Sequence, residues 1–317
     1  MRNFLSVMLA FVTAAGLAMV SAQPPKQDEQ APLPSFRSGV DVVSLNVTVT
    51  DPRNRFVTDI PLEDFMVYED GVQQEITFFN RSQLPIALSL LMDTSASMDD
   101  RMSTVQEAAI GFSRGLRPED LAEIIDFDSR VDILQAFTND LQELEDAIRL
   151  TSAGGSTSLY NALYISLKGL REAPLRIAEL RRQAVVVLSD GEDTSSLVTF
   201  EEVLELAKRS ETAIYTIGLQ AKNDRRSGYR EADFVLRQLA YETGGRSFSP
   251  DDVNDLPAIY QQISDELSSQ YSLGYISSNP LRNGQWRRTI VRVGREDATP
   301  RTKQGYYAPT VGRTRPS

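Results

Sequence analysis

Two of the most apolar stretches of the sequence end in an aspartate, and hydroxyl residues follow the first of them. "LSLLMD" is followed by "TSAS", so that Asp93, Ser95 and Ser97 stand on alternate positions. The second stretch, "VVVLSD", ends at Asp190. Carboxylate and hydroxyl oxygens are hard ligands that suit Mg²⁺ or Mn²⁺. Simpler roles also fit, because Asp and Ser cap helices and Asp-Gly pairs form turns.

A third polar stretch, "AGGSTSLYNAL", places two glycines and three hydroxyl residues at the start of an expected helix. In an open α/β sheet, ligands bind beyond the carboxyl ends of the strands. If this stretch lies on the same edge as Asp93 and Asp190, two carboxylates and several hydroxyls converge on one point. Two carboxylates balance a divalent cation, and neutral hydroxyls leave it electrophilic toward an incoming carboxylate.

The residue types that are missing exclude most hydrolytic chemistry. The 317 residues include no His and no Cys. This excludes Ser-His-Asp and Cys-His hydrolysis, zinc sites built from Cys or His, haem ligation through His or Cys, and thiol redox chemistry. No lysine has a Ser three residues before it, so a Ser-x-x-Lys acyl enzyme is excluded too. We therefore expect a protein without enzymatic activity.

The amino-terminal residues predict export. Arg2 precedes the apolar run "FLSVMLAFVTAAGLAMV", and small residues lie just before Gln23. We expect a signal peptide at residues 1–22 and a polar, Pro-rich linker at residues 23–37, which gives a periplasmic or secreted protein with no membrane segment in its mature form. An uncleaved membrane anchor is the alternative, since the run is almost long enough to span a bilayer. The formal charge of −11 argues against nucleic acid as the main partner.

The rest of the chain divides by its hydrophobic pattern. Residues 38–84 alternate like strands and contain the Asp-Gly hairpin signature "EDGVQ". Residues 85–270 alternate apolar runs with amphipathic segments, which predicts an α/β unit with a doubly wound, mostly parallel sheet. Residues 271–310 return to short β segments, and residues 311–317 form a polar tail. The two β segments form either one sandwich-like unit, into which the α/β unit is inserted, or two separate appendages.

The three polar stretches also carry a family resemblance. "DTSAS", "GGSTSLYNA" and "LSDGEDT" resemble, in order and spacing, the three loops of the metal-ion-dependent adhesion site in von Willebrand factor type A domains. In that family the hydroxyls of the first loop bind the metal directly, and the carboxylate of the third loop usually binds through water. The metal-binding residues that the resemblance implies are Asp93, Ser95, Ser97, Thr157 and Asp190.

Within the second stretch, the resemblance favours Thr157 over its neighbours Ser156 and Ser158, because the "SLYNA" that follows aligns best with the family. Further acidic residues stand near the three loops. We interpret four of them as a solvated rim, namely Asp99, Asp100, Glu192 and Asp193. Two more in "DFDS", Asp126 and Asp128, are interpreted as turn residues between paired strands.

The flanking segments resemble a bacterial group of exported von Willebrand A-related proteins that is abundant in acidobacteria. The resemblance lies in "FRSGVDVVSLNVTVTD", "LEDFMVYEDGVQQEITFF" and "YSLGYI". Together the two resemblances predict an adhesion module in which a Glu or Asp of a partner protein completes the coordination of Mg²⁺ or Mn²⁺. The alternatives are a metal-dependent phosphoesterase, since a metal-bound water can attack a phosphoester, and a structural module with a vestigial site.

Overall fold

A computed structural model gives the fold of most of the chain. The segments predicted as a signal peptide, a linker and a polar tail, and the predicted ligand Asp190, lie outside the described residues. No helix among the residues described is long and apolar enough to cross a membrane. The described ranges are residues 41–81, 84–172, 181–189, 192–219 and 227–310.

A six-stranded sheet forms the centre of the α/β unit, in the order β10-β9-β8-β5-β6-β7. All neighbouring pairs are parallel except β6 and β7. The central strands β5 and β8 are buried almost throughout, as their near-continuous runs of apolar residues predict. The strands are β5 (Ile86–Asp93), β6 (Leu121–Phe127), β7 (Val131–Thr138), β8 (Arg182–Ser189), β9 (Thr212–Gly218) and β10 (Ser247–Phe248).

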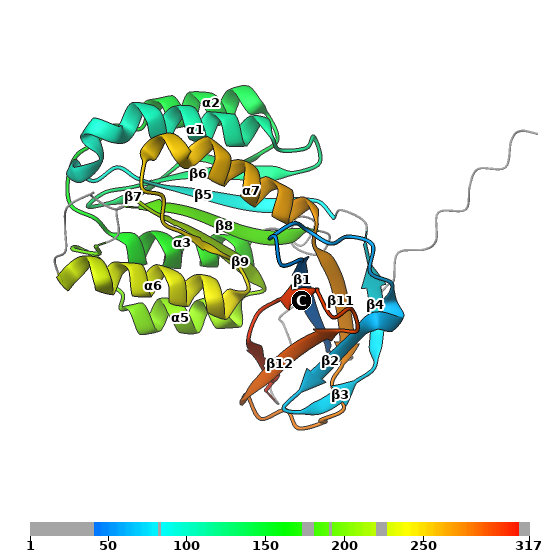
Figure 1. The fold of residues 1–317 in the computed structure, drawn as a ribbon. Coiled ribbons are helices and arrows are strands. Elements are labelled where there is room, and N and C mark those ends of the chain that lie inside the picture. The colour runs from blue at the N-terminus through cyan, green and yellow to red at the C-terminus, as the bar shows by residue number, and fades with distance from the viewer. Residues whose placement is uncertain (1–40, 82–83, 173–180, 190–191, 220–226, 311–317) are drawn as a thin grey trace, which may run out of the picture. The chain divides into compact units, whose positions relative to one another are not determined.

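Helices cover both faces of this sheet (Figure 1), which confirms the predicted mostly parallel α/β fold. One face carries α1 (Met102–Arg114), α2 (Leu141–Leu150) and α7 (Leu256–Ser268). The other carries α3 (Leu159–Glu172), α5 (Phe200–Arg209) and α6 (Ser227–Thr243). Two short 3₁₀ helices, η2 (Ala96–Arg101) and η3 (Val253–Asp255), precede α1 and α7.

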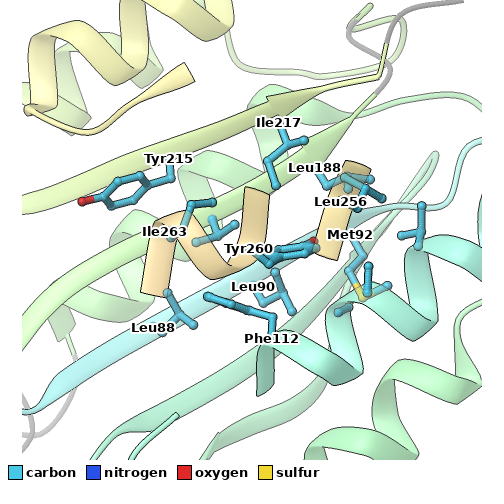
Figure 2. Close-up of a cluster of buried hydrophobic side chains, with 14 of the residues drawn as sticks. Leu88, Leu90, Met92, Phe112, Leu188, Tyr215, Ile217, Leu256, Tyr260 and Ile263 are labelled. Atoms are coloured by element: carbon cyan, nitrogen blue, oxygen red, sulfur yellow. The ribbon is translucent and has the colours of Figure 1, made fainter. Parts of the chain in front are cut away.

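The side chains of β5 contribute to the hydrophobic cores on both faces of the sheet. Leu88, Leu90 and Met92 point to the face of α1 and α7, and the residues between them point to the other face. Figure 2 shows the first cluster, in which the ring of Tyr260 from α7 lies against Phe112 of α1 with ring centroids 4.8 Å apart. Burial of these large side chains against the sheet holds the outer helices in place.

The flanking segments form two four-stranded antiparallel sheets, β13-β1-β11-β4 and β14-β12-β2-β3. Strands from before and after the α/β unit pair with one another in both sheets, for example Leu45 of β1 with Leu273 of β11. At the predicted hairpin, Asp70 and Gly71 have φ of 47° and 85°, as a type I′ turn requires. The elements are β1 (Val42–Thr50), η1 (Leu62–Asp64), β2 (Phe65–Glu69), β3 (Val72–Gln74), β4 (Ile76–Asn80), β11 (Tyr271–Ile276), β12 (Trp286–Val293), β13 (Thr299–Arg301) and β14 (Gly305–Tyr307).

A buried carboxylate joins these sheets to the end of α7. Glu266 is 1% exposed and accepts hydrogen bonds from Tyr215 OH of β9 at 2.8 Å and from Thr48 Oγ1 of β1 at 3.3 Å. Arg301 of β13 forms an ion pair with it at 2.5 Å. Beside this pair, Gly244 has φ of 79°, and a Cβ there would lie 2.5 Å from a backbone nitrogen of the β13–β14 turn. The joint therefore depends on a close backbone approach as well as on charge.

Candidate metal site

The ends of the two central strands meet as the sequence predicts. Asp93, the last residue of β5, is fully buried, and its carboxylate accepts hydrogen bonds from Ser95 N at 2.9 Å and from Ser189 Oγ at 2.5 Å. Ser189 is the last residue of β8. Asp190 follows it directly in the sequence but lies outside the described residues. Asp93 is therefore fixed at the edge of the sheet, beside the strand that leads to Asp190.

The two serines of the first loop differ in exposure. Ser95 is 2% exposed, whereas Ser97 is exposed. Their Oγ atoms lie 3.1 Å apart, and Ser95 Oγ has no other hydrogen-bond partner among the described residues. A buried hydroxyl of this kind costs free energy unless a ligand or water pairs with it.

Backbone hydrogen bonds tie the second loop to the first. Ala96 N donates to Gly155 O at 3.2 Å, and Gly154 N donates to Thr94 O at 2.7 Å. Gly155 has φ of 72°, and a Cβ on it would lie 2.7 Å from Oδ2 of Asp128. Only glycine fits this position without displacing a neighbour, which explains the second glycine of the pair that opens this loop.

Thr157 connects the second loop to the third. Its amide donates to Thr194 Oγ1 at 2.9 Å, and its carbonyl accepts from Thr194 N at 2.8 Å and Ser195 N at 3.1 Å. Thr157 is 5% exposed, and its hydroxyl makes no hydrogen bond within the part of the chain that the structure describes. The structure thus brings the described parts of the three predicted loops together. Among the described residues, the hydroxyls of Ser95 and Thr157 have no hydrogen-bond partner beyond Ser97.

One residue of the predicted acidic rim has a different role. Asp193 is half-buried, and its Oδ1 accepts hydrogen bonds from Tyr160 N at 3.1 Å and from Ser196 Oγ at 2.6 Å. Tyr160 is in the first turn of α3, so Asp193 caps this helix from a distant loop. The interpretation of Asp193 as a solvated rim residue was wrong. Asp99, Asp100 and Glu192 are exposed, as a rim requires.

The interpretation of "DFDS" as a turn holds for Asp128 and not for Asp126. Asp126 lies within β6, and its carboxylate accepts a hydrogen bond from Thr94 Oγ1 of the first loop. Burial raises the pKa of Asp126, and the nearby carboxylates of Asp128 and Asp132 raise it further. Asp126 is therefore a support of the first loop that sequence reasoning missed, because neither its type nor its spacing marks its partner.

The available oxygens fit a hard divalent cation. Four of the five proposed ligands are among the described residues and supply three hydroxyls and one carboxylate, and none of the five is a nitrogen or sulfur ligand. Among the described residues, no group of three or more His, Cys, Asp or Glu side chains is arranged to hold a metal ion. A site of the kind implied by the sequence is instead rich in hydroxyls, and its second carboxylate, Asp190, is not among the residues described.

Residues 88–192 match the family model of the von Willebrand factor type A domain. This segment runs from within β5 to just beyond Asp190 and contains the first two loops of the candidate site. The matched segment includes most of β5 and the whole of β6, β7 and β8 of the mostly parallel sheet, and helices from both of its faces. A comparison with curated proteins found no match.

Several solved structures are similar to this chain. An aerotolerance-related membrane protein from Bacteroides fragilis is 18% identical with a TM-score of 0.45, and 57% of this chain covers 98% of it. The von Willebrand domain of the type V pili tip protein Mfa5 from Porphyromonas gingivalis is 13% identical with a TM-score of 0.48. The match covers 57% of this chain and 94% of that one. A von Willebrand factor type A protein from Catenulispora acidiphila is 10% identical with a TM-score of 0.49. The match covers 87% of this chain and 75% of that one. All three TM-scores are below 0.5, and no property of this chain follows from them.

Proposed function

We propose that this chain is an exported adhesion module that binds a protein partner through a metal ion. Asp93, Ser95, Ser97, Thr157 and Asp190 hold a Mg²⁺ or Mn²⁺ ion, and a Glu or Asp carboxylate of the partner completes its coordination. The metal supplies a positive centre for that carboxylate. The observation that carries the proposal is the buried Ser95 hydroxyl. Among the described residues it has no partner except Ser97, although the loops around it are closely hydrogen-bonded.

Binding is favoured over catalysis by the residues that surround the site. The loops that carry the five proposed ligands contain no His, Cys or Lys, so neither a His general base nor a Lys that could stabilise a phosphoryl group is present in their sequence. A metal-dependent phosphoesterase is the enzymatic alternative. Turnover of phosphoester substrates by the purified protein with Mg²⁺, abolished by a chelator, would favour that alternative over adhesion.

Calorimetric titration with Mg²⁺ and with Mn²⁺ tests the metal site. We expect binding by the wild-type protein and none by Asp93→Asn, which keeps the shape of the side chain and removes its charge. Asp99→Asn is the matched control, because Asp99 is exposed on the same loop and is not a proposed ligand. Equal binding by all three proteins contradicts the proposed ligands, and binding by none contradicts the proposal in favour of a vestigial site.

Ser95→Ala separates a ligand from a structural group. Removal of a buried hydroxyl whose protein pairing is limited to Ser97 should leave the stability of the metal-free protein within about 0.5 kcal/mol of wild type or raise it. The same change should abolish the rise in melting temperature that Mg²⁺ gives to the wild-type protein. A large loss of stability without metal would identify Ser95 as a structural residue instead.

A further inference from the structure

Two leucines are the most exposed large apolar side chains among the residues that the structure describes. Leu197 is 93% exposed and Leu150 is 75% exposed, and Leu281, in a loop of the flanking β-sheets, follows at 60%. Single exposed leucines are ordinary on a protein surface. Here, however, the two most exposed ones both belong to segments that border the candidate metal site.

The chain path places Leu150 and Leu197 at the carboxyl edge of the sheet. β6 ends at this edge, β7 runs back antiparallel to it, and α2 returns so that its last residue, Leu150, lies directly before the second loop. Leu197 is in the third loop, whose backbone is hydrogen-bonded to Thr157. Leu150 therefore precedes the second loop in the chain, and Leu197 lies in the third loop, which contacts the second.

Side-chain amides fix the backbone beside each leucine. Gln106 of α1 donates from Nε2 to Ile148 O at 3.2 Å and to Thr151 O at 3.0 Å, which holds the end of α2. Asn161 of α3 accepts at Oδ1 from Leu197 N at 3.1 Å. Both leucines are thus presented on ordered backbone, which lowers the entropy that a partner must remove on binding.

The charge around the site is mostly acidic. Asp99, Asp100 and Glu192 are exposed on the first and third loops, and Asp132 is exposed at the start of β7. The nearby cations are Arg101, which is half-buried at the end of η2, Arg130, which is exposed on the β6–β7 turn, and Arg149, which forms ion pairs with Glu145 and Asp146. An acidic rim attracts a basic surface and repels an acidic one. A partner that brings a carboxylate to this site must therefore surround that carboxylate with positive charge.

We propose that Leu150 and Leu197 are the apolar anchors of a docking face centred on the metal site. The partner is a protein surface on which one carboxylate stands among Lys or Arg side chains, with apolar sockets that receive the two leucines. This inference rests on the proposed function and adds the chemistry of the partner to it. A few residues that fill well-packed pockets near the centre of a protein interface carry most of its affinity.

A phage-displayed library of random 16-residue peptides, selected on the full-length protein in Mg²⁺, tests this partner chemistry. We expect the selected peptides to share an acidic residue with Lys or Arg nearby and at least one large apolar residue. Their affinity is then measured by fluorescence polarisation on four variants, Leu150→Ser, Leu197→Ser, Leu281→Ser and Asp93→Asn. Selected sequences rich in acidic residues without basic ones would overturn the proposed charge match.

The variants separate this inference from the proposed function. We expect each of Leu150→Ser and Leu197→Ser to weaken peptide binding about tenfold or more. Leu281→Ser should leave it unchanged, and Asp93→Asn should abolish it. Peptides that need Asp93 and bind both leucine variants as well as wild type overturn the docking face while leaving the metal site standing. Recovery of no peptide whose binding depends on Mg²⁺ overturns both.

Discussion

The two edges of the central sheet treat their buried polar groups in opposite ways. At the amino edge, Glu266 is surrounded by donors from three strands, and its charge is paired with Arg301. At the carboxyl edge, the Ser95 hydroxyl has no hydrogen-bond partner among the described residues except Ser97. Both groups lie on hydrogen-bonded backbone, so the difference is not one of order. Paired groups hold the architecture, and unpaired groups at a fixed edge are those that a ligand can use.

Arg182 shows the limits of this contrast. It is buried at the start of β8, and its guanidinium donates to Gln270 Oε1 and Leu84 O, both at 3.0 Å. Its Nε, however, has no partner among the described residues. Burial lowers the pKa of Arg182 to about 10, which still leaves it charged at neutral pH. At the amino edge, the Glu266 carboxylate therefore has several hydrogen-bond partners, whereas the Arg182 guanidinium is only partly hydrogen-bonded among the described residues.

The largest expected effect comes from breaking the pairing at the amino edge. Glu266→Ala leaves Arg301 and the hydroxyls of Tyr215 and Thr48 without their common acceptor. We expect a loss of about 3 kcal/mol in the free energy of unfolding, measured with urea, because one partner of a buried pair is removed. Glu205→Ala is the control. Glu205 of α5 likewise accepts a hydrogen bond from a flanking strand, from Tyr307 OH of β14, but it is half-exposed. Its removal should lower the free energy of unfolding by less than about 1 kcal/mol. Equal losses would contradict the contrast between buried and exposed contacts.

A buried carboxylate midway between the two edges should make stability depend on pH. Glu123 of β6 is 4% exposed and accepts a hydrogen bond from Ser89 Oγ, and burial raises its pKa from 4.5 to about 7. The folded state keeps the proton that the unfolded chain loses above pH 4.5. The stability that the protonated form contributes is therefore present below pH 4.5 and lost as pH rises through about 7.

Glu123→Gln removes this dependence, because glutamine has the shape of the protonated acid. We expect the variant to be more stable than wild type by up to about 3 kcal/mol at pH 8, and close to wild type at pH 4. Urea unfolding at the two pH values measures both differences. A constant difference between the proteins from pH 4 to pH 8 would show that Glu123 does not titrate in this range.

The smallest effects come from two buried tyrosines that differ in pairing. The hydroxyl of Tyr260 has no partner among the described residues, whereas that of Tyr271 accepts from Ile60 N at 3.0 Å and donates to Val57 O at 2.9 Å. We expect Tyr260→Phe to raise the free energy of unfolding by about 1 kcal/mol and Tyr271→Phe to lower it by about 1 kcal/mol. If both variants changed the free energy of unfolding in the same direction, hydrogen-bond pairing of the hydroxyl would not decide whether its removal stabilises or destabilises the protein.

The fold, and the edge of the sheet at which the loops of the candidate site meet, were largely predictable from local pattern. Apolar runs between amphipathic segments predicted the mostly parallel sheet, and Asp93 at the end of such a run predicted which edge would carry the site. The glycine pair marked the second loop, and Gly155 does need its positive φ. These signals lie within a few neighbouring residues, which is why sequence alone reveals them.

The supports of the site were not predictable, because their partners are far away in the sequence. Asp193 caps a helix that begins before it in the chain, and Asp126 holds Thr94 of the preceding strand's loop. Nothing in either local sequence distinguishes such an aspartate from a solvated one. The pairing of Glu266 with Arg301 is hidden for the same reason, since each is an ordinary charged residue in its own segment.

The interleaving of the two flanks sets the order in which the molecule can fold. Val42 of β1 pairs with Ile276 of β11, and Thr48 pairs with Arg301 of β13, so β1 has no neighbour in its sheet until nearly the whole chain has been made. The α/β unit lies between these partners, and its own contacts close shorter loops. We infer that it forms first and brings the flanks together. Until then β1 is an apolar strand with two open edges, which is the stage of the folding pathway most exposed to aggregation.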